Sequence, residues 1–169
     1  MIQTIAQAVI PANDLLPLAL PTLVAAAAYF MKRRADALER RRELCARALA
    51  CVFEWMETPY RIRRRSAGDS GARVLVATAI HDLQERLAFH QAWLRIEIPQ
   101  LADPYETLCG AAKAATARAA QEAWISPGIE SDADMNVGNL GITRPREAEE
   151  AFARAVRHEL SLWRGLLPW

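Results

Sequence analysis

The sequence predicts an all-α protein, in which one N-terminal transmembrane helix is followed by a helical bundle that oligomerises. Three observations indicate this fold class. A charge-free stretch covers residues 15–31, apolar residues recur at helical spacing in three later segments, and no segment alternates apolar and polar residues as a strand would. The 169 residues are enough for one domain, and a hydrophobic content of 52% with 24% charged residues is typical of a folded protein.

Charge is distributed unevenly along the chain, although the formal net charge is only +1. Residues 1–31 contain a single charged side chain, that of Asp14. Residues 32–65 contain 11 Lys/Arg and 5 Asp/Glu, a net charge of 11 − 5 = +6, whereas residues 66–169 contain 10 and 14, a net charge of 10 − 14 = −4. This separation indicates a basic surface with a function and a mildly acidic body.

The stretch LLPLALPTLVAAAAYFM, residues 15–31, is predicted to cross a membrane. At ~1.5 Å per residue a helix of this length covers about 26 Å, close to the ~30 Å of a hydrocarbon core. If the helix extends back toward Ile10, it is long enough to cross the hydrocarbon core, and Asn13 and Asp14 then lie at the headgroups. Tyr29 and Phe30 stand where an interfacial aromatic pair belongs. We therefore expect a short tail (1–13), a transmembrane helix (14–31) and a helical domain (32–169).

The basic residues that follow this stretch predict its orientation. Lys32, Arg33 and Arg34 come directly after it, and the tail before it has no Lys or Arg. The positive-inside rule then places the N-terminus outside and the helical domain in the cytoplasm. An excess of Arg over Lys, 19 to 2, is typical of a GC-rich bacterial genome, so the expected location is the bacterial inner membrane. A signal peptide, a buried helix of a soluble oligomer and an interfacial helix are the alternatives.

Two features of the stretch predict self-association, with a homo-oligomer as the expected state. Pro17 and Pro21 are four residues apart and should kink the helix, and the alanines at 25–28 allow neighbouring helices to approach closely. In an oligomer the pore would be lined by residues of the stretch. These residues are Leu15, Pro17, Leu20, Pro21, Val24 and Ala28.

Four helices are expected after the stretch, at about 32–57, 73–98, 103–124 and 147–164. In the first of them, apolar residues recur at heptad-like steps, and Pro59 marks its end or a kink. The third begins with Asp103-Pro104, which predicts a capping Asp and a Pro at the first helical position. The predicted buried stripes are Leu38, Cys45, Leu49, Val52 and Met56 in the first helix, Val76, Ile80, Leu83, Leu87, Leu94 and Ile98 in the second, and Phe152, Val156, Leu160 and Trp163 in the fourth.

The loop between the last two helices, residues 125–144, has no periodicity. A connection of this length is usually either functional or disordered. Disorder is the favoured interpretation, and an interaction loop is the alternative.

No motif for catalysis, metal binding or a cofactor is found, so the chain is not expected to be an enzyme. His81 and His90 are nine residues apart and lie on opposite faces of one helix, where they cannot share a metal ion. The acids of the loop lack the Gly and Glu positions of a calcium-binding EF-hand. The cysteines, Cys45, Cys51 and Cys109, have no metal or redox spacing and are expected to be reduced and partly buried.

Two arginine clusters are the candidate binding residues for an anion or phosphate: Arg40, Arg41 and Arg42, and Arg61, Arg63, Arg64 and Arg65. Arginine binds phosphate well because its planar guanidinium donates two parallel hydrogen bonds, and Tyr60 and Trp55 nearby offer rings for bases. Pairing with acids of the 66–169 body and contact with anionic lipid are the alternatives.

These observations favour an oligomeric membrane effector whose helices form an ion-conducting pore, regulated by an anion such as a nucleotide or oligonucleotide. In the order of its parts, the chain resembles membrane effectors of bacterial anti-phage systems, which join a short membrane segment to a ligand-sensing domain. The likeness concerns the layout alone and includes no motif. The alternative is a membrane tether or scaffold that recruits a partner protein through the 125–144 loop or the apolar C-terminal segment.

Overall fold

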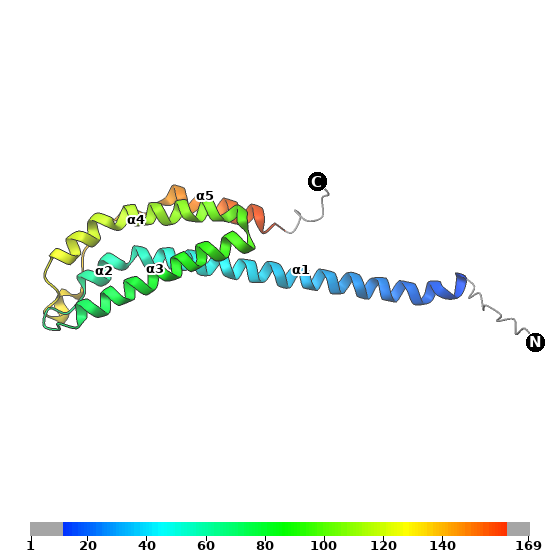
Figure 1. The fold of residues 1–169 in the computed structure, drawn as a ribbon, viewed down its shortest axis with the longest axis horizontal. Coiled ribbons are helices and arrows are strands. Elements are labelled where there is room, and N and C mark those ends of the chain that lie inside the picture. Colours follow the sequence, from blue (N-terminus) through cyan, green and yellow to red (C-terminus); the bar gives the residue numbers. More distant parts are fainter. Residues whose placement is uncertain (1–11, 162–169) are drawn as a thin grey trace, which may run out of the picture. The chain divides into compact units, whose positions relative to one another are not determined.

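The computed structural model describes the backbone of residues 12–161 and the side chains of residues 21–161 except that of residue 132. Within this range the chain forms five α-helices and two short 3-10 helices (Figure 1). Their bounds are α1 Ala12–Met56, α2 Thr58–Arg63, α3 Ala72–Glu97, η1 Pro99–Leu101, α4 Ala102–Ile125, η2 Asp132–Met135 and α5 Arg146–Glu159. The described residues contain no strand, only an isolated bridge between Ser66 and Ile129. The expectation of an all-α fold is therefore confirmed.

The chain divides into two compact units, residues 1–40 and residues 41–169. In the second unit, the end of α1 packs with α2, α3, α4 and α5 into a bundle. Tyr105 at the start of α4 donates a hydrogen bond to the carbonyl oxygen of Ala48 at 3.1 Å, and Trp55 donates its indole N–H to the hydroxyl of Thr116 at 3.0 Å. Both bonds join α1 to α4, which stands about sixty residues later in the chain.

The predicted core stripes are largely confirmed. Side chains at the expected helical spacing are buried in the bundle: Cys45 and Val52 of α1, Leu83, Leu87 and Leu94 of α3, and Phe152 of α5. Leu38, Ile98 and Leu160 are also buried, whereas Leu49, Met56, Val76, Ile80 and Val156 are half-buried. Trp163 lies outside the described residues. The cysteines are free and buried, as expected.

One predicted boundary is confirmed and another is wrong. The first helix ends at Met56, three residues before Pro59, which occupies the first turn of α2, where a proline costs no hydrogen bond. Asp103 does not cap α4, because η1 continues directly into that helix and the N-cap residue is Leu101. Asp103 instead contributes a negative charge to the first turn, where it interacts favourably with the helix dipole.

Among the residues searched, which are those that the structure describes, no helix is both long enough and apolar enough to cross a membrane.

Candidate functional site

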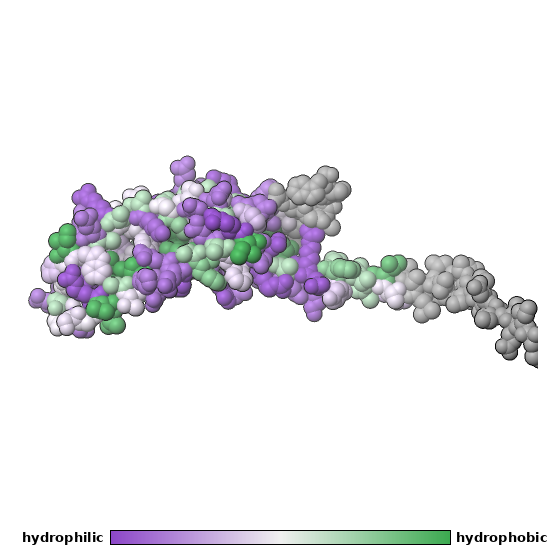
Figure 2. Space-filling model, in the orientation of Figure 1, coloured by the Kyte–Doolittle hydropathy of each residue, from purple (hydrophilic) through white to green (hydrophobic). Residues whose placement is uncertain are grey.

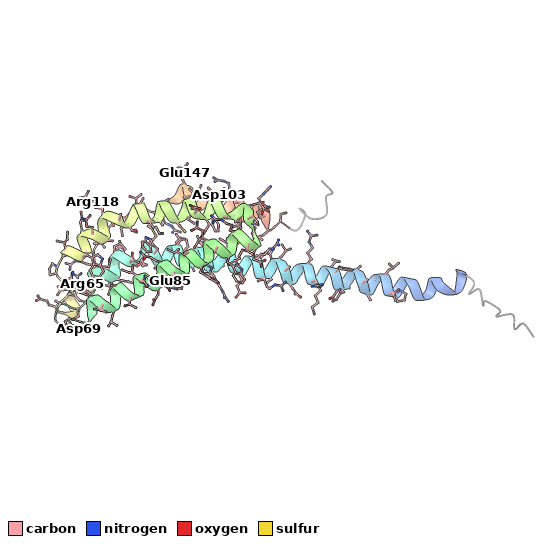
Figure 3. The ribbon with its side chains drawn as sticks, in the orientation of Figure 1. Arg65, Asp69, Glu85, Asp103, Arg118 and Glu147 are labelled. Carbon is pink, nitrogen blue, oxygen red and sulfur yellow. The ribbon has the colours of Figure 1, made fainter. Side chains whose placement is uncertain are left out.

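The second arginine cluster lies at the end of the bundle where α2 meets the C-terminus of α4 (Figure 3). Arg61 and Arg63 belong to α2, Arg64 is its C-cap residue, and Arg65 follows. Loop 125–144 covers this end, because Ile129 exchanges backbone hydrogen bonds with Arg65 and Ala67. The cluster and the loop are therefore best described as one assembly, which we call the arginine clamp.

Arg65 is the centre of the arginine clamp. Its side chain is only 8% exposed, and its guanidinium donates to four carbonyl oxygens, those of Ile62, Ala123, Trp124 and Ser126. It also lies 5.6 Å from the centre of the Trp124 ring. The last carbonyls of a helix have no partner within that helix and carry partial negative charge, so a buried cation satisfies them well. Burial lowers the pKa of Arg65, and the charges of Arg73 and Arg63 lower it further.

The other members of the cluster also have partners within the chain. Arg63 donates to the carbonyl oxygen of Pro127, and Arg64 donates to that of Met135 at 3.3 Å while lying over the Tyr60 ring. Arg61 pairs with Glu54 of α1 at 2.9 Å. The sequence predicted that these guanidiniums converge on an external anion, or on acids of the 66–169 body. Three of the four instead bind backbone carbonyls of residues 62–135.

Gly128 allows the loop to approach the backbone of Arg65 and Ala67 closely. A Cβ atom at this position would lie 2.5 Å from the carbonyl oxygen of Arg65 and 2.8 Å from the amide nitrogen of Ala67. No side chain fits there, so the position requires glycine. Within 125–144, residues 126–135 are held by backbone bonds, three arginines and a capping box at Ser131 and Asp134, so the favoured expectation of disorder is wrong for this part of the loop.

The loop borders a polar groove of about 580 Å³ lined by Arg63, Glu130, Asp134, Asn136 and Asn139, among others. No group of three His, Cys, Asp or Glu side chains within the described residues is arranged to hold a metal ion. His81 and His158 are exposed beside Glu85 and Glu159, and His90 is buried with no hydrogen-bond partner for its Nδ1 atom in the described structure.

The first arginine cluster, Arg40, Arg41 and Arg42, lies on α1, and its side chains are exposed. Sequence reasoning overlooked Arg73, whose guanidinium lies 5.7 Å from the centre of the Trp124 ring. No sequence pattern distinguishes this arginine, because its neighbour stands 51 positions later in the chain. Binding of an anion by either cluster remains a prediction.

The predicted membrane residues belong to the first turns of α1. Every side chain from 21 to 31, including those of Pro21, Val24 and Ala28, is exposed. Leu23 is 67%, Phe30 67% and Met31 73% exposed. Figure 2 shows mainly hydrophobic colours along this part of α1 and hydrophilic colours beyond it. The side chains of Leu15, Pro17 and Leu20 lie outside the described residues.

Large apolar side chains are also exposed on the bundle, and apart from Phe53 of α1 they lie in two places. One place is the end that carries the arginine clamp, where Val74, Leu75, Ile125 and Met135 are exposed. The other is the C-terminal half of α3, where Phe89, Trp93 and Ile96 are exposed.

No protein-family model, no curated protein and no solved structure matches this chain.

Proposed function

We infer that this protein is a membrane-anchored scaffold: the N-terminal part of α1 is its anchor, and the helical bundle recruits a partner protein at the cytoplasmic face of the membrane. One observation carries the proposal. Residues 21–31 are eleven consecutive uncharged positions whose side chains are all exposed, and Lys32, Arg33 and Arg34 follow directly. The charge-free sequence begins six residues earlier, at Leu15.

Apolar surface of this extent is unfavourable in water, at roughly 25 cal/mol per Å². The hydrocarbon core of a membrane would remove this apolar surface from water. The Arg33 guanidinium lies 5.9 Å from the centre of the Tyr29 ring, and aromatic and basic side chains are enriched where a helix leaves the hydrocarbon core. The basic residues directly after the charge-free stretch support an orientation in the bacterial inner membrane with the N-terminus outside and the bundle in the cytoplasm.

The arginine clamp favours a scaffold over a ligand-gated pore. A pore opened by a nucleotide or oligonucleotide needs guanidiniums that are available to phosphate. In the second cluster those of Arg63, Arg64 and Arg65 bind carbonyl oxygens of their own chain, so this cluster is less suited to that role than the exposed first cluster. The arginines of the clamp also hold part of loop 125–144, in which Met135 is exposed, and Ile125 at the end of α4 is exposed as well. A rigid surface with exposed apolar side chains is suited to protein recognition.

Flotation of the purified full chain with liposomes tests the anchor. We expect the protein to float with the liposomes and the L23R/A27R variant to remain in the dense fraction, because each arginine in the bilayer costs about 2.5–3.5 kcal/mol. The matched control is V74R/L75R, which places the same charges on exposed apolar positions of α3 and should float normally. Equal flotation of all three proteins, or of none, would exclude this anchor.

A further inference from the structure

Three consecutive basic residues of α1, Lys32, Arg33 and Arg34, follow the charge-free stretch directly. Lys32 and Arg33 are exposed, and Arg34 is half-buried. These are the only charged residues of the sequence between positions 15 and 35, and the first acid after them is Asp36. The end of the anchor therefore concentrates positive charge at one level of the helix, with no acid at that level to offset it.

An aromatic pair stands just before these basic residues. Tyr29 and Phe30 are 57% and 67% exposed, and their ring centres lie 5.8 Å apart. The Arg33 guanidinium lies over the Tyr29 ring. The face of an aromatic ring attracts a cation without accepting a conventional hydrogen bond, so this contact leaves the N–H donors of Arg33 available for an oxygen ligand. Arg65 of the bundle differs, because its donors bind four carbonyl oxygens.

The directions of the three basic side chains indicate the kind of ligand. Successive residues of an α-helix point about 100° apart, so Lys32, Arg33 and Arg34 point to different sides of α1. A partner protein covers one side of a helix, whereas lipid headgroups surround a helix wherever it leaves a bilayer. Cations directed to several sides at one level therefore suit a lipid surface better than the surface of a single protein.

We propose that Lys32, Arg33 and Arg34 bind the phosphates of anionic phospholipids, so that lipids of net negative charge are enriched around the anchor. This inference rests on the proposed function, because the headgroups meet these residues only if residues 15–31 cross the bilayer. Arginine donates two parallel hydrogen bonds to a phosphate, and lysine adds a compact charge. Each basic residue near an anionic surface strengthens the attraction about fivefold, so a preference of about fivefold or more over zwitterionic lipid is expected.

Energy transfer in mixed liposomes of phosphatidylcholine and phosphatidylglycerol tests this preference with the full chain. The donor dye is attached to an A35C variant, at an exposed position beside the basic residues. The native cysteines are buried, and burial raises the pKa of each thiol, so they label slowly. The acceptor dye is on an acyl chain of either lipid. The association constant of phosphatidylglycerol should exceed that of phosphatidylcholine about fivefold or more, and this ratio should approach one in ~1 M salt.

Two triple variants of A35C show which charges are responsible. K32Q/R33Q/R34Q should lower the ratio of the two association constants to near one. The matched control K113Q/R118Q/R154Q also removes one lysine and two arginines, in this case from the bundle, and should keep the ratio of A35C. An equal loss in both variants would overturn the proposal, because the attraction would then depend on the total charge of the chain. Circular dichroism of each variant confirms that the helices are retained.

Flotation of the same samples separates the lipid preference from the anchor. If A35C fails to float with the liposomes, the anchor is absent and the lipid preference that depends on it is also excluded. If A35C floats but shows a ratio near one, the anchor stands and the preference for anionic lipid is overturned. A high ratio that persists in ~1 M salt overturns it as well, because attraction between exposed charges is screened at that ionic strength.

Discussion

The Nη1 atom of Arg65 lies 2.8 Å from the carbonyl oxygen of Ala123, a residue 58 positions later in the chain. This hydrogen bond joins the segment after α2 to the end of α4, and the carbonyls of Trp124 and Ser126 accept from the same guanidinium. The arginine that the sequence presents as a ligand-binding residue is therefore a structural element of the bundle.

Replacement of Arg65 should destabilise the protein strongly. The R65K variant keeps the charge but cannot reach four carbonyl oxygens, so buried acceptors lose their donor. We expect a loss of about 2–4 kcal/mol in the free energy of unfolding, measured by urea denaturation. The neighbouring R64A variant, whose side chain is exposed, should lose less than about 0.5 kcal/mol. Similar losses in the two variants would show that Arg65 is not the centre of the clamp.

Substitution of glycine by alanine should have opposite effects at two positions. At Gly128 the new Cβ would meet the backbone of Arg65 and Ala67, so G128A should lower the free energy of unfolding by about 1–3 kcal/mol. At Gly110, within α4, nothing lies within 4 Å, so G110A should raise it by about 0.5–1 kcal/mol. Thermal unfolding of both variants measures the difference, and a stable G128A would refute the close approach of the loop.

The core of this fold could be predicted from the sequence, whereas the arginine clamp could not. Apolar spacing is a local property, and it located the buried stripes of α1, α3 and α5. The role of Arg65 depends on the position of Ala123 in space, which no local pattern reveals. The consecutive arginines therefore suggested an external anion, although their partners lie in the chain. The loop was misread for the same reason, because its order comes from distant contacts.

Stability should fall in mildly acidic solution because of His90. Burial lowers the pKa of His90 in the folded state, and the charges of Arg47 and Arg86 lower it further from the usual 6.5. The unfolded chain therefore binds a proton at His90 more readily than the folded chain. The contribution of neutral His90 to the free energy of unfolding is complete above pH 6.5 and is lost as the pH falls from there toward the pKa of His90 in the folded state. H90Q should weaken the dependence of the melting temperature on pH between 7.5 and 5.5. An unaltered H90Q profile would exclude this role.

The scaffold model predicts that the inserted protein conducts no ions. In potassium-loaded liposomes that carry the full chain, potassium release should match that of empty liposomes, with or without short oligonucleotides. Release that requires the full chain and disappears in L23R/A27R would support a pore instead. If an oligonucleotide changed that release and R61A/R63A/R64A abolished the change, the arginines would be a ligand sensor after all.

Hydrogen exchange along α1 in liposomes tests the central claim, that this helix enters the membrane, most directly. Residues 15–31 and 32–40 belong to one helix, and apart from the packing of Leu38 the bilayer is the main difference between their environments. The account predicts that amides of 15–31 exchange far more slowly than those of 32–40, and that L23R/A27R removes the contrast. Equal and rapid exchange of both segments in the wild-type chain would contradict the membrane anchor.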